Sequence, residues 1–304
     1  MHNQLNRRQF FAGAFMSALT SPLVAKSAMS NAEMVRNDGP FIKYSLNAYS
    51  FNTPLRAGEL TLFDVIDFCA LNNISGLDAT GYYFPGYPQQ PPDRFIYDLK
   101  RKAFLNGITI HGTGIKNDFA VQDEKSRKND VQMVKNWINV GEKLGASVIR
   151  IFSGKTRPEG CSFDQVLEWM VPDIQECAAY GKSHGVMVGL QNHNDFLKTA
   201  SETIRLVEAV DSDWFGVVLD IGSLRQKDPY QEIAMLLPYA VSWQLKETVW
   251  YGANQVPTDM AKIAEIINKS SYRGFLPLET LGSGDPKIKI KKLLKETRKH
   301  IKNS

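Results

Sequence analysis

Four apolar segments in the second half of the sequence each end in a residue whose side chain can bind a divalent metal ion. They read VGLQN (188–192), VVLD (217–220), SWQLKE (242–247) and LPLET (276–280). The candidate ligands are Gln191, Asp220, Gln244 and Glu279, separated by 29, 24 and 35 residues. Carboxylate and amide oxygens suit Mg²⁺ or Mn²⁺, whereas a structural zinc site prefers Cys and His. These residues therefore predict a divalent metal site for Mn²⁺ or Mg²⁺, and hence an enzyme.

The spacing of these segments is that of one strand, loop and helix, so parallel strands could bring their carboxyl ends to one point. Eight such units in roughly 260 residues predict a (β/α)8 TIM barrel, a fold of about 250 residues, as a single domain over 41–304. An open doubly wound sheet would need a Gly-rich phosphate loop after its first strand, and SFNTPLRAGEL (50–60) is not one. The expected strands are 42–51, 76–83, 108–115, 147–154, 186–193, 214–220, 240–247 and 273–280.

Helix boundaries are marked in the sequence as well. Between 124 and 145, Val131, Val134 and Ile138 follow the spacing of a buried helical stripe, and Gly145 stands where a glycine ends a helix. The net charge of +4 comes in part from the Lys-rich segment 287–302. Apolar residues recur there at helical spacing, which predicts an amphipathic last helix and no nucleic-acid-binding patch.

The first 27 residues have the layout of an export signal. Arg7 and Arg8 precede an apolar stretch at 10–19, which is far shorter than the ~20 residues of a membrane span. The arginine pair with the residues after it is similar to a twin-arginine signal, whose pathway exports folded proteins. We therefore expect an exported, periplasmic protein with a signal at 1–27, a polar lead-in at 28–40 and no membrane span.

Four motifs resemble those of the xylose isomerase-like TIM barrels, the superfamily of sugar phosphate isomerases and epimerases, over about residues 42–300. Members of that family end strand five in L-E-N-H, strand six in L-D-x-G-H, strand seven in H-x-K-D and strand eight in P-x-E. The corresponding segments here read LQNH (190–193), LDIGSL (219–224), QLKE (244–247) and PLET (277–280). Asp220, Lys246 and Glu279 match the family pattern, whereas Gln191 replaces a glutamate and both Gln244 and Ser223 replace histidines.

These replacements change the chemistry that the resemblance implies. Epimerases of the family resemble two-base enzymes, in which the glutamates of strands five and eight act on opposite faces of a carbon beside a carbonyl. Gln191 cannot act as a base, so Glu279 is the expected base, and a metal ion or Lys246 would stabilise the enediolate. We therefore expect metal-assisted isomerisation or, as in inosose dehydratases, β-elimination of a keto-sugar or glycoside derivative. The predicted class is a divalent-metal-dependent isomerase, with a lyase as the next choice.

Polar and aromatic residues near the other strand ends would bind such a carbohydrate by hydrogen bonds and ring packing. Two other functions remain open: a catalytically degenerate sugar-binding barrel, and a hydrolase related to metal nucleases, for which five histidines are few. Lys246 has a structural alternative, an ion pair with Glu247 or another acid. The candidate substrate contacts are Asn47, Tyr83, His111, Lys116, Arg150, His193 and Trp250.

Overall fold

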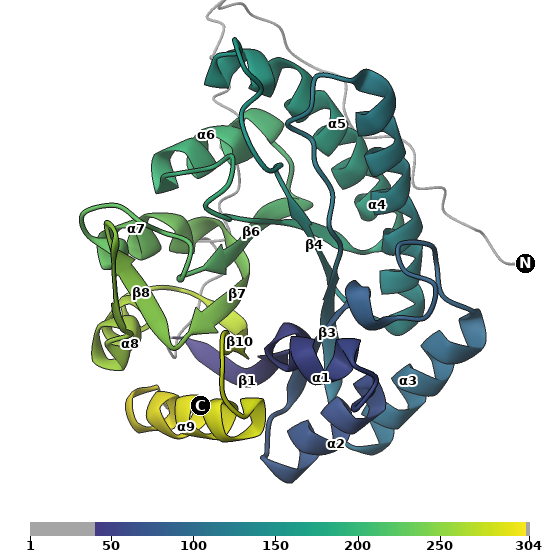
Figure 1. Cartoon of the computed structure of the whole chain (residues 1–304), viewed down its shortest axis with the longest axis vertical. Coiled ribbons are helices and arrows are strands. Elements are labelled where there is room, and N and C mark those ends of the chain that lie inside the picture. The colour runs from purple at the N-terminus through teal and green to yellow at the C-terminus, as the bar shows by residue number, and fades with distance from the viewer. Residues whose placement is uncertain (1–39, 302–304) are drawn as a thin grey trace, which may run out of the picture.

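The computed structural model of the chain describes residues 40–301, in which eight parallel strands close into one barrel. The strands follow one another around the barrel in sequence order, and the last strand, β10, pairs with the first, β1 (Figure 1). This arrangement confirms the predicted (β/α)8 TIM barrel. The barrel strands are β1 (Phe41–Asn47), β2 (Gly76–Thr80), β3 (Thr109–Gly114), β4 (Val148–Phe152), β5 (Met187–Gln191), β6 (Phe215–Asp220), β7 (Ala240–Lys246) and β10 (Arg273–Glu279).

Helices cover the outside of the barrel and connect one strand to the next (Figure 1). Several begin at a Ser, Thr or Asp whose side chain accepts a hydrogen bond from the first turn, as helix N-termini require. The α-helices are α1 (Asn52–Arg56), α2 (Leu62–Leu71), α3 (Asp93–Leu105), α4 (Glu124–Leu144), α5 (Phe163–His184), α6 (Ala200–Val210), α7 (Pro229–Leu236), α8 (Met260–Asn268) and α9 (Pro286–His300). Short 3₁₀ turns are η2 (Ala48–Phe51), η3 (Gly81–Tyr83) and η4 (Leu237–Tyr239).

The helices predicted from apolar spacing are present. Helix α4 buries Val131, Val134 and Ile138, and it ends at Gly145, whose φ of 79° is the left-handed conformation that glycine adopts without strain. The predicted last helix is α9, which buries the leucines of its apolar stripe and leaves most of its lysines exposed. Apolar periodicity thus located both helices correctly.

All eight barrel strands are shorter than predicted, two of them because a 3₁₀ turn begins at their carboxyl end, and one hairpin was not expected at all. The segment 42–51 leaves the strand after Asn47, because that side chain accepts a hydrogen bond from the Tyr49 amide and begins η2. The segment 76–83 ends as a strand at Thr80, where η3 begins. Between β7 and α8 the chain forms an antiparallel hairpin of β8 (Thr248–Tyr251) and β9 (Asn254–Pro257). The two turns and the hairpin all lie at the carboxyl ends of barrel strands, where the connecting loops surround the site.

The interior of the barrel is closed by side chains below the carboxyl ends of its strands. The His111 ring stacks on the Phe275 ring with 4.4 Å between the ring centroids, and His111 Nε2 lies 2.5 Å from Ser45 Oγ. Gly76 is required beside them, since a Cβ at this position would lie 2.5 Å from the Phe275 ring. These four residues fill the barrel by tight packing.

The predicted export signal (1–27) and nearly all of the predicted lead-in lie outside residues 40–301. Within 40–301, no helix is both long and apolar enough to cross a membrane.

Candidate active site

A cavity of about 390 Å³ lies at the carboxyl ends of the barrel strands. Residues at the ends of β1, β4, β5, β7 and β10 line it, and active sites of TIM barrels lie at this end. A larger hollow of about 700 Å³ lies against α7, α8 and the amino ends of β7 and β10, but none of the predicted site residues lines it. The smaller cavity is therefore the candidate active site. Of the predicted residues, it is lined by Asn47, Lys116, Arg150, Gln191, His193, Gln244, Lys246 and Glu279.

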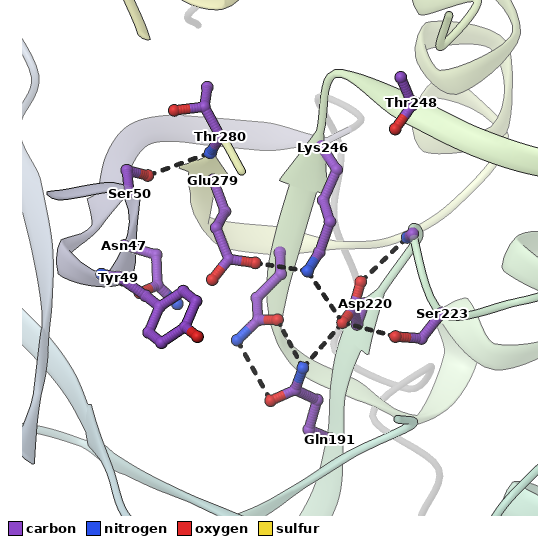
Figure 2. Close-up of polar contacts among 12 residues, drawn as sticks. Asn47, Tyr49, Ser50, Gln191, Asp220, Ser223, Lys246, Thr248, Glu279 and Thr280 are labelled. Atoms are coloured by element: carbon purple, nitrogen blue, oxygen red, sulfur yellow. Dashed lines mark hydrogen bonds and ion pairs between the residues drawn. The ribbon is translucent and has the colours of Figure 1, made fainter. Parts of the chain in front are cut away.

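The four predicted metal ligands come together with Lys246 in one buried cluster (Figure 2). The strand pairing places Asp220 beside Gln244 and Glu279 beside Lys246. Gln191 Nε2 donates to Asp220 Oδ2 at 2.7 Å and to Gln244 Oε1 at 2.8 Å. Four successive strands thus deliver these side chains to one point, as the spacing in the sequence suggested.

Asp220 lies at the centre of the cluster and is completely buried. Its Oδ2 accepts hydrogen bonds from Gln191 Nε2 and from Ser223 Oγ, the latter at 2.8 Å, and its Oδ1 accepts one from the Gly222 amide at 2.9 Å. Asn192, which sequence reasoning passed over, clamps the Asp220 backbone, with its Oδ1 2.8 Å from the amide nitrogen and its Nδ2 2.9 Å from the carbonyl oxygen. These hydrogen bonds fix the Asp220 carboxylate in place at the centre of the site.

Lys246 forms ion pairs with Asp220 and Glu279, and not with its sequence neighbour Glu247. Its Nζ lies 3.1 Å from Asp220 Oδ2 and 2.5 Å from Glu279 Oε2, whereas Glu247 pairs with Lys289 at 3.1 Å. Burial by itself would lower the pKa of Lys246, but the carboxylates of Asp220 and Glu279 outweigh it and raise the pKa above the ordinary value. Lys246 is therefore an ammonium ion at neutral pH and cannot serve as a base.

A divalent ion does not fit this arrangement of side chains. The Lys246 ammonium lies between the two carboxylates that would have to hold the ion. Gln191 turns N–H donors, which do not bind cations, toward Asp220 and Gln244. Across residues 40–301, no group of three or more His, Cys, Asp or Glu side chains is placed to hold a metal. The geometry therefore gives no support to the Mg²⁺ or Mn²⁺ site expected from the sequence.

An aromatic wall faces the cluster across the cavity, but Tyr83 is not part of it. The hydroxyl of Tyr83 donates to Asn52 Oδ1 at 3.0 Å, behind the residues that line the cavity, of which Arg56 donates to the same oxygen. Its neighbour Tyr82 lines the cavity together with Tyr49 and Tyr87, and the Tyr82 ring meets the other two edge to face. Tyr82, which sequence reasoning did not select, therefore lines the cavity, and Tyr83 lies beside it outside the lining.

Arg150 lines the cavity as a buried cation that the barrel wall holds in place. Its guanidinium donates to the Ile115 carbonyl oxygen and, at 3.1 Å, to the Tyr82 hydroxyl. Gly114 makes room for it, since a Cβ at that position would lie 2.8 Å from Arg150 Nε. Burial raises the pKa of nearby Asp78 to about 6, and the charge of Arg150 opposes part of that shift. Arg150 thus presents a fixed positive charge to a ligand.

His111 and Trp250 do not line this cavity. His111 lies deeper in the barrel against Ser45 and Phe275, and burial lowers its pKa to about 3, so that it is neutral and inaccessible to a substrate. Trp250 lies on β8, which carries it to a neighbouring hollow of about 440 Å³ that also borders Lys246 and Glu279. The assignment of His111 as a substrate contact is therefore corrected, and Trp250 belongs to the margin of the site.

A histidine–aspartate pair at the end of β5 completes the group of ionisable residues. His193 Nδ1 lies 2.7 Å from Asp195 Oδ2, and both residues line the cavity. Sequence reasoning found His193 but missed Asp195, although its position two residues further on is within reach of the ring. A carboxylate that fixes the orientation of an imidazole is a common arrangement in proton transfer.

Comparisons with known proteins agree with this fold. No curated protein sequence matches the chain. The structure of D-psicose 3-epimerase from Clostridium cellulolyticum H10, solved with D-tagatose, is 18% identical, with a TM-score of 0.72 over 85% of this chain and 99% of that one. The structure of 3-keto-D-glucoside 4-epimerase from E. coli is 12% identical, with a TM-score of 0.68 over 86% of this chain and 99% of that one.

A third structure, of the protein IolI with a bound zinc atom, is 14% identical, with a TM-score of 0.67 over 86% of this chain and 99% of that one. At such identities the likeness concerns the fold, and two of these three neighbours are sugar epimerases. A family model covers most of the sequence, since that of the xylose isomerase-like TIM barrels matches residues 71–304. The chain therefore belongs to the xylose isomerase-like TIM barrel family.

Proposed function

We propose that the protein is a sugar isomerase or epimerase-like enzyme that removes the proton next to the carbonyl of a keto-sugar or glycoside derivative, with Glu279 as the base. The observation that carries this proposal is the position of the Glu279 carboxylate. It lines the cavity at the end of β10, while Asp220, the other carboxylate of the cluster, is completely buried beneath it. A base must reach the proton that it removes, and Glu279 meets this condition.

The surroundings of Glu279 suit proton abstraction. The amide of the next residue, Thr280, donates to Ser50 Oγ at 3.1 Å and fixes the end of the strand (Figure 2). Lys246 has three N–H donors, of which two meet Asp220 and Glu279, so the third can donate to the substrate oxygen on which negative charge develops. Glu279 and Lys246 together provide a base and an oxyanion donor within one cavity.

His193 is the second group in the cavity that can move a proton. Its ring lies at the end of β5, and Asp195 orients it through Nδ1, which leaves Nε2 for the ligand. With the abstracted proton held by Glu279, a protonated His193 that gives its own proton to the opposite face of the same carbon would produce an epimer. Protonation of the former carbonyl carbon, with the neighbouring hydroxyl proton passing to the former carbonyl oxygen, would produce an isomer. Expulsion of a β-substituent from the same enolate would instead make the enzyme a lyase.

The test is exchange of substrate hydrogen with heavy water. The protein is incubated in D₂O with D-fructose, D-tagatose or a 3-keto-D-glucoside, and deuterium at the carbon beside the carbonyl is followed by NMR. Glu279→Gln keeps the size of the side chain and removes the base, so the exchange rate should fall by about 100-fold or more. Glu265→Gln, the same change on the exposed face of α8, is the matched control and should exchange at the wild-type rate.

Two results would contradict the proposal. Wild-type exchange rates in Glu279→Gln would assign the base to another residue. Binding of these sugars without any exchange would favour the alternative function, a sugar-binding barrel without catalysis.

The proposal also concerns the cellular compartment in which the protein binds its sugar. The export signal predicted at 1–27 implies a substrate outside the cytoplasm, and fractionation of cells that produce the full chain tests it. Recovery of the protein from the cytoplasm with its first 27 residues intact would refute export.

A further inference from the structure

The centre of the site holds a positive charge that belongs to the chain itself. Lys246 Nζ lies 3.1 Å from Asp220 Oδ2 and 2.5 Å from Glu279 Oε2, and the three side chains are 11%, 0% and 4% exposed (Figure 2). Buried carboxylates need a compensating cation, because their charges are otherwise costly to remove from water. Here the ammonium group of Lys246 provides this compensation.

The position of Lys246 is determined by the barrel. Its backbone pairs with that of Glu279 across β7 and β10, and its own carbonyl oxygen accepts a hydrogen bond from Thr258 Oγ1 at 2.8 Å. The aliphatic part of the side chain packs on Gly222, where a Cβ would lie 2.5 Å from Lys246 Cδ. A residue with any side chain at 222 would thus collide with Lys246. The lysine is therefore part of the packed site.

The rest of the cluster matches one positive charge better than two. Two carboxylates and two neutral amides surround the position, and one N–H of Gln191 already points to Asp220 at 2.7 Å. Three groups would have to turn away before oxygens could coordinate a dication here. They are the Lys246 ammonium and the N–H groups of Gln191 and Gln244. Repulsion between Lys246 and a dication would add to that cost.

We propose that the ammonium group of Lys246 occupies the place of a divalent metal ion, and that loss of its charge would open a latent metal site formed by Asp220, Glu279 and the oxygens of Gln191 and Gln244. The site of the wild-type protein then works with no divalent ion. This inference concerns the same cavity as the proposed function but is tested by metal binding and not by turnover, so that either proposal can fail alone.

The experiment compares the Mn²⁺ affinity of the wild-type protein with that of Lys246→Met. Methionine retains the packing of the lysine stem on Gly222 and removes the charge. Protein is freed of metal with a chelator, Mn²⁺ is titrated by calorimetry, and bound metal is counted by elemental analysis after gel filtration. Wild type should bind Mn²⁺ with a dissociation constant above about 1 mM, the weak end of the range for oxygen ligands. Lys246→Met should bind one ion at least about 100-fold more tightly.

Two controls show where a new ion binds. Lys116→Met removes a positive charge from the exposed rim of the same cavity, and its Mn²⁺ affinity should equal that of wild type. Adding Asp220→Asn to Lys246→Met should abolish the gained site, because the buried carboxylate is its main ligand. A gain seen in Lys116→Met as well would mean that overall charge controls Mn²⁺ binding and would overturn the proposal.

Other outcomes also decide the matter. A stoichiometric Mn²⁺ ion bound tightly by wild type and lost in Asp220→Asn would show that Lys246 swings aside for a metal. Folded Lys246→Met and Lys246→Gln proteins that bind Mn²⁺ as weakly as wild type would show that no latent site exists. Either result overturns the proposal. Should neither variant fold, tight Mn²⁺ binding by wild type overturns the proposal, and a dissociation constant above about 1 mM supports the part of it in which Lys246 takes the place of the ion.

Discussion

The buried imidazole of His111 should make the stability of the protein strongly dependent on pH, and His111→Gln should remove that dependence. His111 is 5% exposed, and its Nε2 lies 2.5 Å from Ser45 Oγ. Glutamine can occupy the same space and bond the same hydroxyl, but it does not titrate. A comparison of the two proteins therefore isolates the cost of protonating the buried ring.

The sign and size of the effect follow from the shifted pKa of His111. Burial lowers this pKa from 6.5 to about 3. As the pH falls below 6.5, the unfolded chain takes up a proton that the folded protein refuses, so the free energy of unfolding decreases until about pH 3. Each pH unit in this window costs about 1.4 kcal/mol. Between pH 7.5 and pH 4.5 the wild-type protein should therefore lose about 3 kcal/mol more than His111→Gln.

The assay is urea-induced unfolding followed by circular dichroism at both pH values. Asp78 acts in the opposite direction, because burial raises its pKa to about 6 and the folded protein then holds a proton that the unfolded chain has released. This contribution is present in both proteins and cancels in the difference between them. His184→Gln, the same change at a histidine on the outer surface of α5, serves as the control.

A difference below about 0.5 kcal/mol between wild type and His111→Gln would refute this reasoning. It would mean that His111 takes up a proton in the folded state, and thus that the ring is accessible to water. In that case the earlier assignment of His111 as a substrate contact would be restored.

Three further predictions concern the cluster. Asp220→Ala leaves Lys246 and three other donors without their acceptor, so the free energy of unfolding in urea should fall by about 3–5 kcal/mol; a loss below about 1 kcal/mol would contradict the burial described. Gln191→Glu places a third carboxylate against Asp220, so Mn²⁺ should raise the thermal unfolding temperature of this variant more than that of wild type. Equal shifts in the two proteins would contradict this prediction. Gly222→Ala should cost about 1–3 kcal/mol in urea through collision with Lys246, whereas Gly141→Ala, whose new methyl has no neighbour closer than 3.5 Å, should be nearly neutral.

The strands and their order could be predicted because the apolar runs are regular. Each of the barrel strands β5, β6, β7 and β10 ends in a polar side chain, and in a parallel barrel such ends must face one opening. The register that places Asp220 beside Gln244 and Glu279 beside Lys246 was not predicted and comes from the structure. Sequence periodicity therefore predicted that these strand ends share one opening, but not which of their side chains are paired.

The errors come from segments where the chain leaves the strand. Tyr83 was chosen because it ends the predicted strand 76–83, whereas the strand ends at Thr80 and Tyr82 of η3 lines the cavity. The β8–β9 hairpin was missed, although Thr248 to Tyr251 is a run of β-prone residues before Gly252, because an extra hairpin breaks the expected alternation of strand and helix. Local turn geometry is not encoded in hydrophobic periodicity, and these errors have that common cause.

The ion-pair partner of Lys246 could not be predicted for a different reason. The sequence showed that Lys246 follows Gln244 by two residues on one strand, so that both point inward, but it contained no information on which acid the long side chain would reach. Neighbours along the chain made Glu247 a natural partner, whereas the barrel brings Glu279 from the next strand within 2.5 Å. Competition among acids is decided by tertiary packing, which a single sequence does not reveal.

The packing of His111 against Ser45 and Phe275 limits how a ligand can enter and leave the cavity. Within residues 40–301, these side chains and Gly76 are packed against one another below the cavity and separate it from the amino ends of the strands. Whatever binds above them must depart through the opening by which it arrived. In the enzyme that we propose, a product molecule would therefore have to leave before the next substrate enters, so that product should inhibit competitively.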